Sequence, residues 1–232
     1  MADFLSNVTQ YLPQFWAAFL VTLRLAIVSL IFATIVGIIC GLINTSKSKN
    51  PILVILRAIV KIYIEIIRGT PMLVQILIIY FGISQVLRPF GFSWNKLGGI
   101  FTAGVVVLTI NAGAYMAEII RAGIEAVDKG QIEAARSLGL SYFQTMSKIV
   151  LPQAIRTMLP SIVNQFIISI KDTSLMSTVG LPELTNTGKT IAAVWTSQTM
   201  NLYCFMALYY LVICFVLSRI SKFLEGRMTY GR

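Results

Sequence analysis

Four long runs of residues without a charged side chain dominate the sequence. They cover residues 25–46, 69–87, 97–117 and 190–218. At about 1.5 Å of rise per helical residue, each run is long enough to cross a hydrocarbon core of roughly 30 Å. A fifth apolar run, residues 157–170, is too short alone. We expect its helix to begin near Pro152, with Arg156 reaching back to the membrane surface.

This pattern predicts an all-α, polytopic membrane protein in which residues 1–232 form a single domain. Five transmembrane helices are expected, at about 15–43, 69–88, 97–119, 152–171 and 195–219. Residues 1–13 contain no Lys or Arg, so they lack the basic start of a cleavable signal peptide. The first span is therefore expected to remain in the mature protein.

Residues 52–67, between the first two spans, have the pattern of an amphipathic helix. Its charged residues recur at intervals of four, four and three, which places them on one helical face; they are Arg57, Lys61, Glu65 and Arg68. One interpretation is a helix lying in the inner membrane interface. The other is a helix that leads into the second span and lines a pathway between subunits with its charges. In either case, Gly69-Thr70-Pro71 is expected to break or kink the helix.

Composition supports the membrane assignment and excludes several functions. Hydrophobic residues make up 56% of the chain, charged residues only 12%, and the mean hydropathy is +0.79. The net charge of +10 is spread between apolar runs rather than gathered into a patch with aromatic residues, so no nucleic acid is expected as a partner. The absence of histidine removes His-based catalytic triads and most zinc sites.

The distribution of basic residues predicts the orientation. Lys47 and Lys49 follow the first span. Four more basic residues follow the last span: Arg219, Lys222, Arg227 and Arg232. By the positive-inside rule both regions are cytoplasmic, which places the N-terminus outside and the segment 128–151 inside.

The cytoplasmic segment 128–151 has a recognisable local structure. It contains Glu133-Ala134-Ala135, then Gly139, and it ends in Ile149-Val150-Leu151, which Pro152 follows. Residues 132–138 favour a helix, and Gly139 suits a left-handed C-terminal cap. Ser141 and Gln144 match a capping box that starts a second short helix. We therefore predict a helix-turn-helix that projects between spans three and four.

These residues resemble the cytoplasmic coupling loop of permeases of type I ATP-binding-cassette (ABC) importers, the EAA motif. Three further stretches resemble the polar amino acid branch of that family, which includes histidine, glutamine and arginine permeases. They are the run 65–71, the run 111–123 with Asn111, Tyr115, Glu118 and Arg121, and the run 171–175. The resemblance covers the chain from about Phe15 to its end.

The resemblance implies a non-enzymatic transport subunit in a prokaryotic inner membrane. Such a permease pairs with a second copy or a close paralogue, sits on two ABC ATPase subunits, and receives an amino acid from an extracytoplasmic binding protein. The chain has no phosphate-binding glycine loop, so ATP and its Mg²⁺ are expected on the partner ATPase. The residues implied in coupling are Glu133, Ala134, Ala135, Gly139, Ile149, Leu151 and Pro152. Two other classes of protein are disfavoured. The chain has neither the selectivity filter that a channel requires nor the catalytic groups that a membrane-embedded enzyme requires.

Polar side chains inside the predicted spans are the candidate substrate ligands. They are Thr70, Asn111, Asn164 and Gln165. Amides can equally well bond neighbouring helices, and the sequence leaves both roles open. No Asp or Glu lies in the central part of a span, so a bound substrate is expected to have an uncharged polar side chain.

Overall fold

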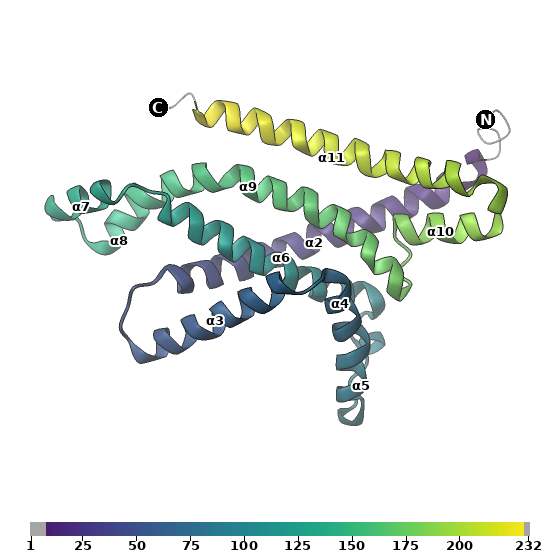
Figure 1. Ribbon diagram of the computed structural model, residues 1–232, viewed down its shortest axis with the longest axis horizontal. Helices are drawn as coiled ribbons and strands as arrows, with labels where there is room; N and C mark the ends of the chain where they lie inside the picture. Colours follow the sequence, from purple (N-terminus) through teal and green to yellow (C-terminus); the bar gives the residue numbers. More distant parts are fainter. Residues whose placement is uncertain (1–7, 230–232) are drawn as a thin grey trace.

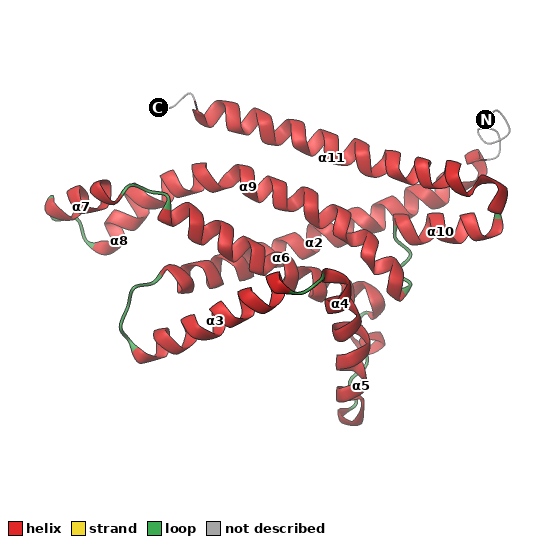
Figure 2. Ribbon diagram, in the orientation of Figure 1, coloured by secondary structure: helices red, strands yellow, loops and turns green. Residues whose placement is uncertain are grey.

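The computed structural model describes residues 8–229, and the regular elements in that range are all helices (Figures 1 and 2). In chain order they are η1 (Thr9–Tyr11), α2 (Leu12–Thr45), α3 (Pro51–Gly69), α4 (Met72–Leu77), η2 (Ile78–Gly82), α5 (Ile83–Leu87), η3 (Arg88–Phe90), η4 (Trp94–Leu97), α6 (Gly99–Glu125), α7 (Lys129–Ser137), α8 (Tyr142–Thr145), η5 (Met146–Val150), α9 (Leu151–Asp172), η6 (Thr173–Val179), α10 (Leu184–Val194), η7 (Thr196–Gln198) and α11 (Thr199–Thr229). Two of the basic residues that follow the last predicted span are not fully described: Arg232 lies outside residues 8–229, and the side chain of Arg227 is not described.

Four helical stretches within the described residues are long and apolar enough to cross a membrane. They are Thr9–Thr45, Met72–Phe90, Gly99–Glu125 and Thr196–Phe223. The multi-pass, all-helical prediction is therefore confirmed. The span predicted at 152–171 corresponds to helix α9. This helix is not among these four stretches, so the count of five spans does not follow from length and composition.

Helices α2 and α6 pack against each other along much of their length. A Cβ atom added at Gly37 of α2 would collide with the Cβ of Met116 on α6, and one added at Gly41 would lie 2.9 Å from the Cβ of Ile120. The two glycines are four residues apart and so lie on one face. They let the two helices approach closely, which is the packing role that a small-xxx-small pair predicts.

The predicted break after the amphipathic helix is present. Helix α3 ends at Gly69, and Thr70 has an extended backbone (φ −121°, ψ 145°) because a residue before proline is pushed out of the helical region. After Pro71, helix α4 still packs against α6, with Ile76 fully buried beside Leu25 and Val107, whereas α5 projects away from the group formed by α2, α6, α9 and α11 (Figure 1). The break thus separates α3 from a second helical segment that packs on α6 at its start and projects from the bundle at α5.

The second short helix of the cytoplasmic segment differs from the prediction because it is not separated from α9. Helix α8, the π-helical segment η5 and helix α9 follow one another without a loop. The wider π-helical turn ends at Val150, two residues before Pro152, which has no N–H to give to a residue four positions earlier. Pro152 therefore lies in the first turn of α9, as predicted, but the helical path enters α9 from α8 without a break.

The last membrane-crossing stretch begins at Thr196, close to the predicted residue 195, but the chain before it differs from the prediction. Helix α11 begins at Thr199, and an unpredicted helix, α10, precedes it. The fully buried carboxylate of Glu183 caps α10 by accepting the N–H groups of Thr185 and Asn186, and it also accepts the hydroxyl of Tyr210 on α11. Burial raises the pKa of the Glu183 carboxyl, and these hydrogen bonds oppose the shift. The bond between Tyr210 and Glu183 therefore holds the start of α10 against α11.

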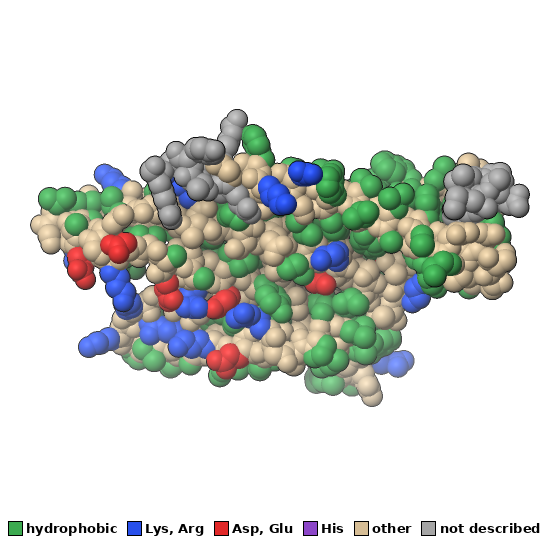
Figure 3. Space-filling model, turned by 45° about the horizontal axis from the view of Figure 1, so that its top comes forward, with side chains coloured by type: hydrophobic (Ala, Val, Ile, Leu, Met, Phe, Trp, Pro, Cys, Tyr) green, Lys and Arg blue, Asp and Glu red, His purple; other side chains and the backbone are tan. Residues whose placement is uncertain are grey.

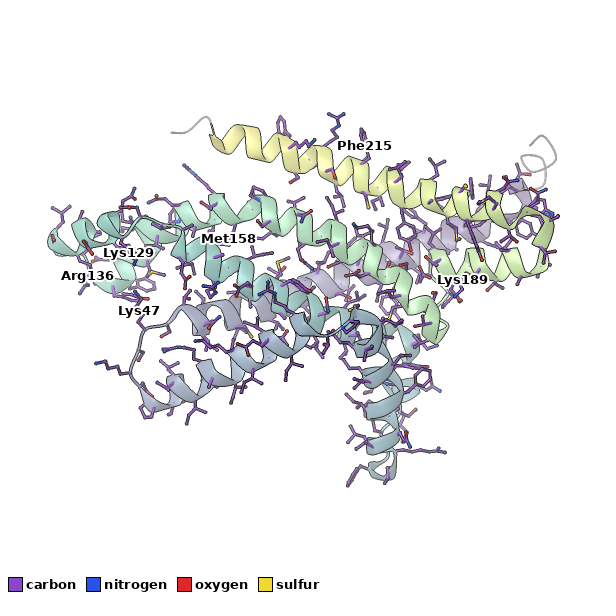
Figure 4. The ribbon with its side chains drawn as sticks, in the orientation of Figure 1. Lys47, Lys129, Arg136, Met158, Lys189 and Phe215 are labelled. Carbon is purple, nitrogen blue, oxygen red and sulfur yellow. The ribbon has the colours of Figure 1, made fainter. Side chains whose placement is uncertain are left out.

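Basic residues that the sequence places in the cytoplasm share one end of the molecule. Lys47, Lys129 and Arg136 lie together at one end in Figure 4, near the end of α11, whereas Lys189 lies toward the opposite end, near the start of α2. The segments on the two sides of the predicted membrane are therefore separated along the longest axis of the molecule.

Candidate functional site

The helical hairpin formed by α7 and α8 is built by local capping interactions. Asp128 caps the start of α7 by accepting the N–H of Gln131 at 3.3 Å. Gly139 ends the helix with φ +83°. The N–H of Gly139 reaches the carbonyl of Arg136 at 3.0 Å, and that of Leu140 reaches Ala135 at 3.2 Å. These two bonds form a Schellman motif, so the predicted left-handed cap is confirmed.

The start of α8 also agrees with the prediction. The hydroxyl of Ser141 accepts the N–H of Gln144 at 3.2 Å, and the side chain of Gln144 accepts the N–H of Ser141 at 2.9 Å. This reciprocal pair is the capping box that the sequence indicated. The turn between α7 and α8 is therefore fixed by hydrogen bonds on both sides, within the backbone after α7 and from side chains at the start of α8.

The hairpin presents an apolar tip to its surroundings. Leu138 is 81% exposed, Phe143 78% and Tyr142 67%. On α7, Glu133 and Ala134 are also exposed, whereas Ala135 is buried against the hairpin. Large exposed apolar side chains next to a charged residue are typical of a protein docking surface. The sequence analysis identified Glu133 and Ala134 but missed the three apolar side chains of the tip.

The base of the hairpin is anchored to α6 and α9. Ile132 of α7 packs against a buried apolar cluster from α6, α9 and the two segments that flank the hairpin: Ile120, Ile124, Val127, Val150, Ala154 and Met158. The amide of Gln153 on α9 donates to Gln131 on α7 at 2.6 Å. Ile149 and Leu151 are half-buried near this cluster and Pro152 is exposed, so these three lie at the base of the hairpin and not at its tip.

Three polar side chains from α4, α6 and the break form a continuous hydrogen-bonded chain. The amide nitrogen of Gln75 donates to the hydroxyl of Thr70 at 2.9 Å and to the carbonyl of Ile67 at 2.8 Å. Its amide oxygen accepts from Asn111 at 2.9 Å. Gln75 and Asn111 are both buried. The structure thus brings the predicted residues Thr70 and Asn111 together through Gln75, which the sequence analysis missed.

The two remaining candidates, Asn164 and Gln165, lie on α9. Gln165 is buried and its amide nitrogen lies 3.5 Å from the hydroxyl of Ser169, whereas Asn164 is exposed. Among the described residues, no hydrogen bond joins either of them to Gln75 or Asn111. The four candidates therefore form two groups, one at the break and one on α9.

A cavity of about 400 Å³ lies between the end of α3, helix α6 and helix α9. Its lining combines opposite charges, hydroxyls and apolar side chains, and includes Arg68, Tyr115, Glu118, Thr157, Met158 and Ser161. Asn164 and Gln165 follow Ser161 by three and four residues, so they continue the same face of α9 one turn beyond the cavity. This cavity was not predicted, although the helical spacing of the charges on α3 indicated a common polar face.

The charged face of α3 is turned toward α6. Ion pairs join Arg121 of α6 to Glu118 and Glu125, and Arg68 of α3 lies 3.9 Å from Glu118. The opposite face of α3 exposes isoleucines such as Ile55, Ile59 and Ile62. In Figure 3, acidic and basic side chains gather over the part of the molecule that α3 occupies. Arg57 donates instead to the carbonyl of Ser48, so this arrangement favours the pathway interpretation for Lys61, Glu65 and Arg68 only.

Comparisons with known proteins agree on one family. Residues 33–230 match the family model described as binding-protein-dependent transport system inner membrane component. The chain is 39% identical over 207 residues to the glutamine transport system permease protein GlnP of Escherichia coli (strain K12), covering 89% of each chain. It is 38% identical over 230 residues to the probable glutamine ABC transporter permease protein GlnP of Bacillus subtilis (strain 168), covering 98% of this chain and 100% of the relative. A crystal structure of an amino acid ABC transporter with histidines matches with a TM-score of 0.85 and 39% identity, covering 97% and 98% of the two chains.

Proposed function

This chain belongs to the family of binding-protein-dependent transport system inner membrane components, and we propose that it forms the membrane pathway of an ATP-driven importer for a polar amino acid. It is a multi-pass membrane permease subunit of an ABC transporter and not an enzyme. The observation that supports the substrate class is the similarity, at 38–39% identity over nearly the whole chain, to permeases named for glutamine. Glutamine is therefore the first candidate substrate.

The topology in this proposal has five spans: α2, α4 to α5 with its π-helical segment, α6, α9 and α11. Helix α9 is less apolar than the others, but it packs against both α6 and α11, so much of its surface faces protein and not lipid. Buried polar faces are tolerated in a span that is surrounded by other helices. With five spans, the start of α2 is outside and the end of α11 is cytoplasmic, in the inner membrane of a prokaryotic cell.

The α7–α8 hairpin is the proposed contact with the ATPase. Glu133, Ala134 and the exposed tip formed by Leu138, Tyr142 and Phe143 supply a docking surface. Ala135, Gly139, Ile149, Leu151 and Pro152 shape the hairpin and connect it to α9. Because the hairpin shares a buried cluster with α6 and α9, a movement at its tip is transmitted to two helices that line the cavity. ATP and Mg²⁺ belong to the partner ATPase, and two such subunits serve two permease copies or paralogues.

The proposed substrate path follows α9 from the outer polar residues to the cavity. Asn164 and Gln165 lie one turn beyond Ser161, and Thr157 follows one turn further toward the hairpin. Thr70 and Asn111 border the break at the end of α3 through their bonds to Gln75. Amide and hydroxyl groups both donate and accept hydrogen bonds, which suits a neutral polar side chain such as that of glutamine.

Reconstitution tests the proposal. The permease, its ATPase and the binding protein would be assembled in liposomes, and uptake of labelled glutamine, cystine, histidine, arginine and glutamate would be compared with and without ATP. We expect ATP-dependent uptake of glutamine that requires the binding protein. Failure to import any of these amino acids, in a complex that still hydrolyses ATP, would contradict the proposed function.

A further inference from the structure

A second cavity adjoins the first one and shares part of its wall. It has a volume of about 380 Å³ and lies among the end of α2, the charged face of α3 and α6. Its charged lining consists of Lys61, Glu65, Arg68, Glu118, Arg121 and Glu125. Among the described residues, only Arg68 and Glu118 line both cavities. A molecule that moves from one cavity to the other therefore passes these two side chains.

The two shared residues are held very differently. Both carboxylate oxygens of Glu118 accept hydrogen bonds from the guanidinium of Arg121, one of them from Nε at 3.0 Å. Such a two-point contact fixes the position of a carboxylate. Arg68 makes only a loose contact with Glu118, at 3.9 Å, and its guanidinium also lies 5.6 Å from the ring centre of Tyr115.

Arg68 is consequently available to a ligand. Its side chain is 43% exposed, and the described residues provide no carboxylate closer to it than Glu118. An exposed ion pair at that distance contributes little, so exchanging it for another carboxylate costs little. The planar guanidinium can bind a carboxylate through two parallel hydrogen bonds, which an ammonium group cannot do.

Every free amino acid has an α-carboxylate and an α-ammonium group, so a site that recognises this part needs both charges close together. We propose that Arg68 binds the α-carboxylate of the transported amino acid at the boundary between the two cavities, while Arg121 holds Glu118 in place as the opposite charge for the α-ammonium group. The inference rests on the proposed function and adds to it a residue that selects zwitterions. The second cavity is then the continuation of the path beyond this boundary.

The test compares Arg68→Gln and Arg68→Lys with Arg57→Gln in the complete transporter. Arg57 is on the same helix, but it lines neither cavity and donates to the carbonyl of Ser48. Uptake of labelled glutamine and ATP hydrolysis would be measured in liposomes. Direct binding of glutamine and of its α-amide, which lacks the carboxylate, would be measured on the purified permease–ATPase complex without the binding protein.

We expect Arg68→Gln to reduce glutamine uptake at least about tenfold while ATP hydrolysis changes little, because a charge-assisted hydrogen bond is lost. Arg68→Lys should restore part of the uptake, and Arg57→Gln should behave as the wild type. The wild-type preference for glutamine over its α-amide should shrink in Arg68→Gln. A purely structural role would weaken both ligands equally and leave this ratio unchanged.

The possible failures are distinguishable. A wild-type complex that imports none of the amino acids refutes the proposed function and this inference with it. Wild-type uptake of glutamine, together with an unchanged ratio of glutamine to α-amide binding in Arg68→Gln, refutes the inference alone.

Discussion

At the scale of single residues, the polar groups inside the membrane show what sequence can and cannot predict. Asn111 was predictable as a residue that needs a partner, because an unpaired amide in an apolar environment is costly. Its partner was not, because Gln75 reaches it only through the direction that α4 takes after the break at Thr70 and Pro71. Contacts between residues far apart in the chain depend on helix packing, which local patterns do not encode.

Replacement of Asn111 tests the hydrogen-bonded chain. Asn111→Ala leaves the buried oxygen of Gln75 without its donor, which should destabilise the permease by about 1–2 kcal/mol. Asn164→Ala is the matched control, because Asn164 is exposed and should change the unfolding temperature much less. Thermal unfolding of the purified permease in one detergent would compare them. Equal unfolding temperatures for both variants would mean that the bond to Gln75 contributes nothing to stability.

At the scale of helices, apolar length identified the principal elements, and the misplaced boundaries have physical causes. Helix α10 was missed because its start depends on Glu183, whose burial requires Tyr210 from a helix further along the chain. The uncharged run 190–218 therefore looked like one span, although the chain turns at residues 195–198. Pro152 marks the first turn of α9 as predicted, but the sequence does not reveal the π-helical segment that joins α9 to α8.

The close packing of α2 and α6 predicts the effect of a single methyl group. Gly37→Ala would place a Cβ against Met116, so the helices must separate, and we expect a destabilisation of about 1–3 kcal/mol. Gly69→Ala is the control, because a Cβ at Gly69 meets nothing within 4 Å. Chemical unfolding in mild detergent measures both. A Gly37→Ala variant as stable as Gly69→Ala would show that the two helices are not packed this closely.

The cap of α7 predicts a graded effect on coupling. Gly139 has φ +83°, a conformation that costs a β-branched residue about 1–3 kcal/mol, whereas asparagine adopts it more readily. Gly139→Val should misplace the tip of the hairpin and lower ATP-driven uptake, with Gly139→Asn intermediate between it and the wild type. The affinity of the separate binding protein for its amino acid should stay the same. Uptake at the wild-type rate by Gly139→Val would show that transport does not depend on the geometry of the hairpin.

At the scale of the whole molecule, the distribution of charge along the longest axis predicts which end faces the cytoplasm. Lys47, Lys129 and Arg136 lie together at the end that carries the hairpin, and Lys189 lies toward the other end (Figure 4). Basic residues near the ends of spans are retained in the cytoplasm during insertion, so the hairpin end should be inside. The same orientation is needed if the hairpin contacts an ATPase, which works where ATP is present.

Labelling of single cysteines tests this orientation directly. The three native cysteines, Cys40, Cys204 and Cys214, would first be replaced by serine or alanine. A membrane-impermeant maleimide added to intact cells from which any outer barrier has been removed should then label Lys189→Cys but not Gly130→Cys. Gly130→Cys should react only after the membrane is opened, because it lies in the first turn of α7 at the opposite end of the molecule. Both positions are at the surface in the structure, so accessibility to the reagent and not burial decides the result. Labelling of Gly130→Cys in intact cells would reverse the orientation, and the hairpin would then face away from any ATPase.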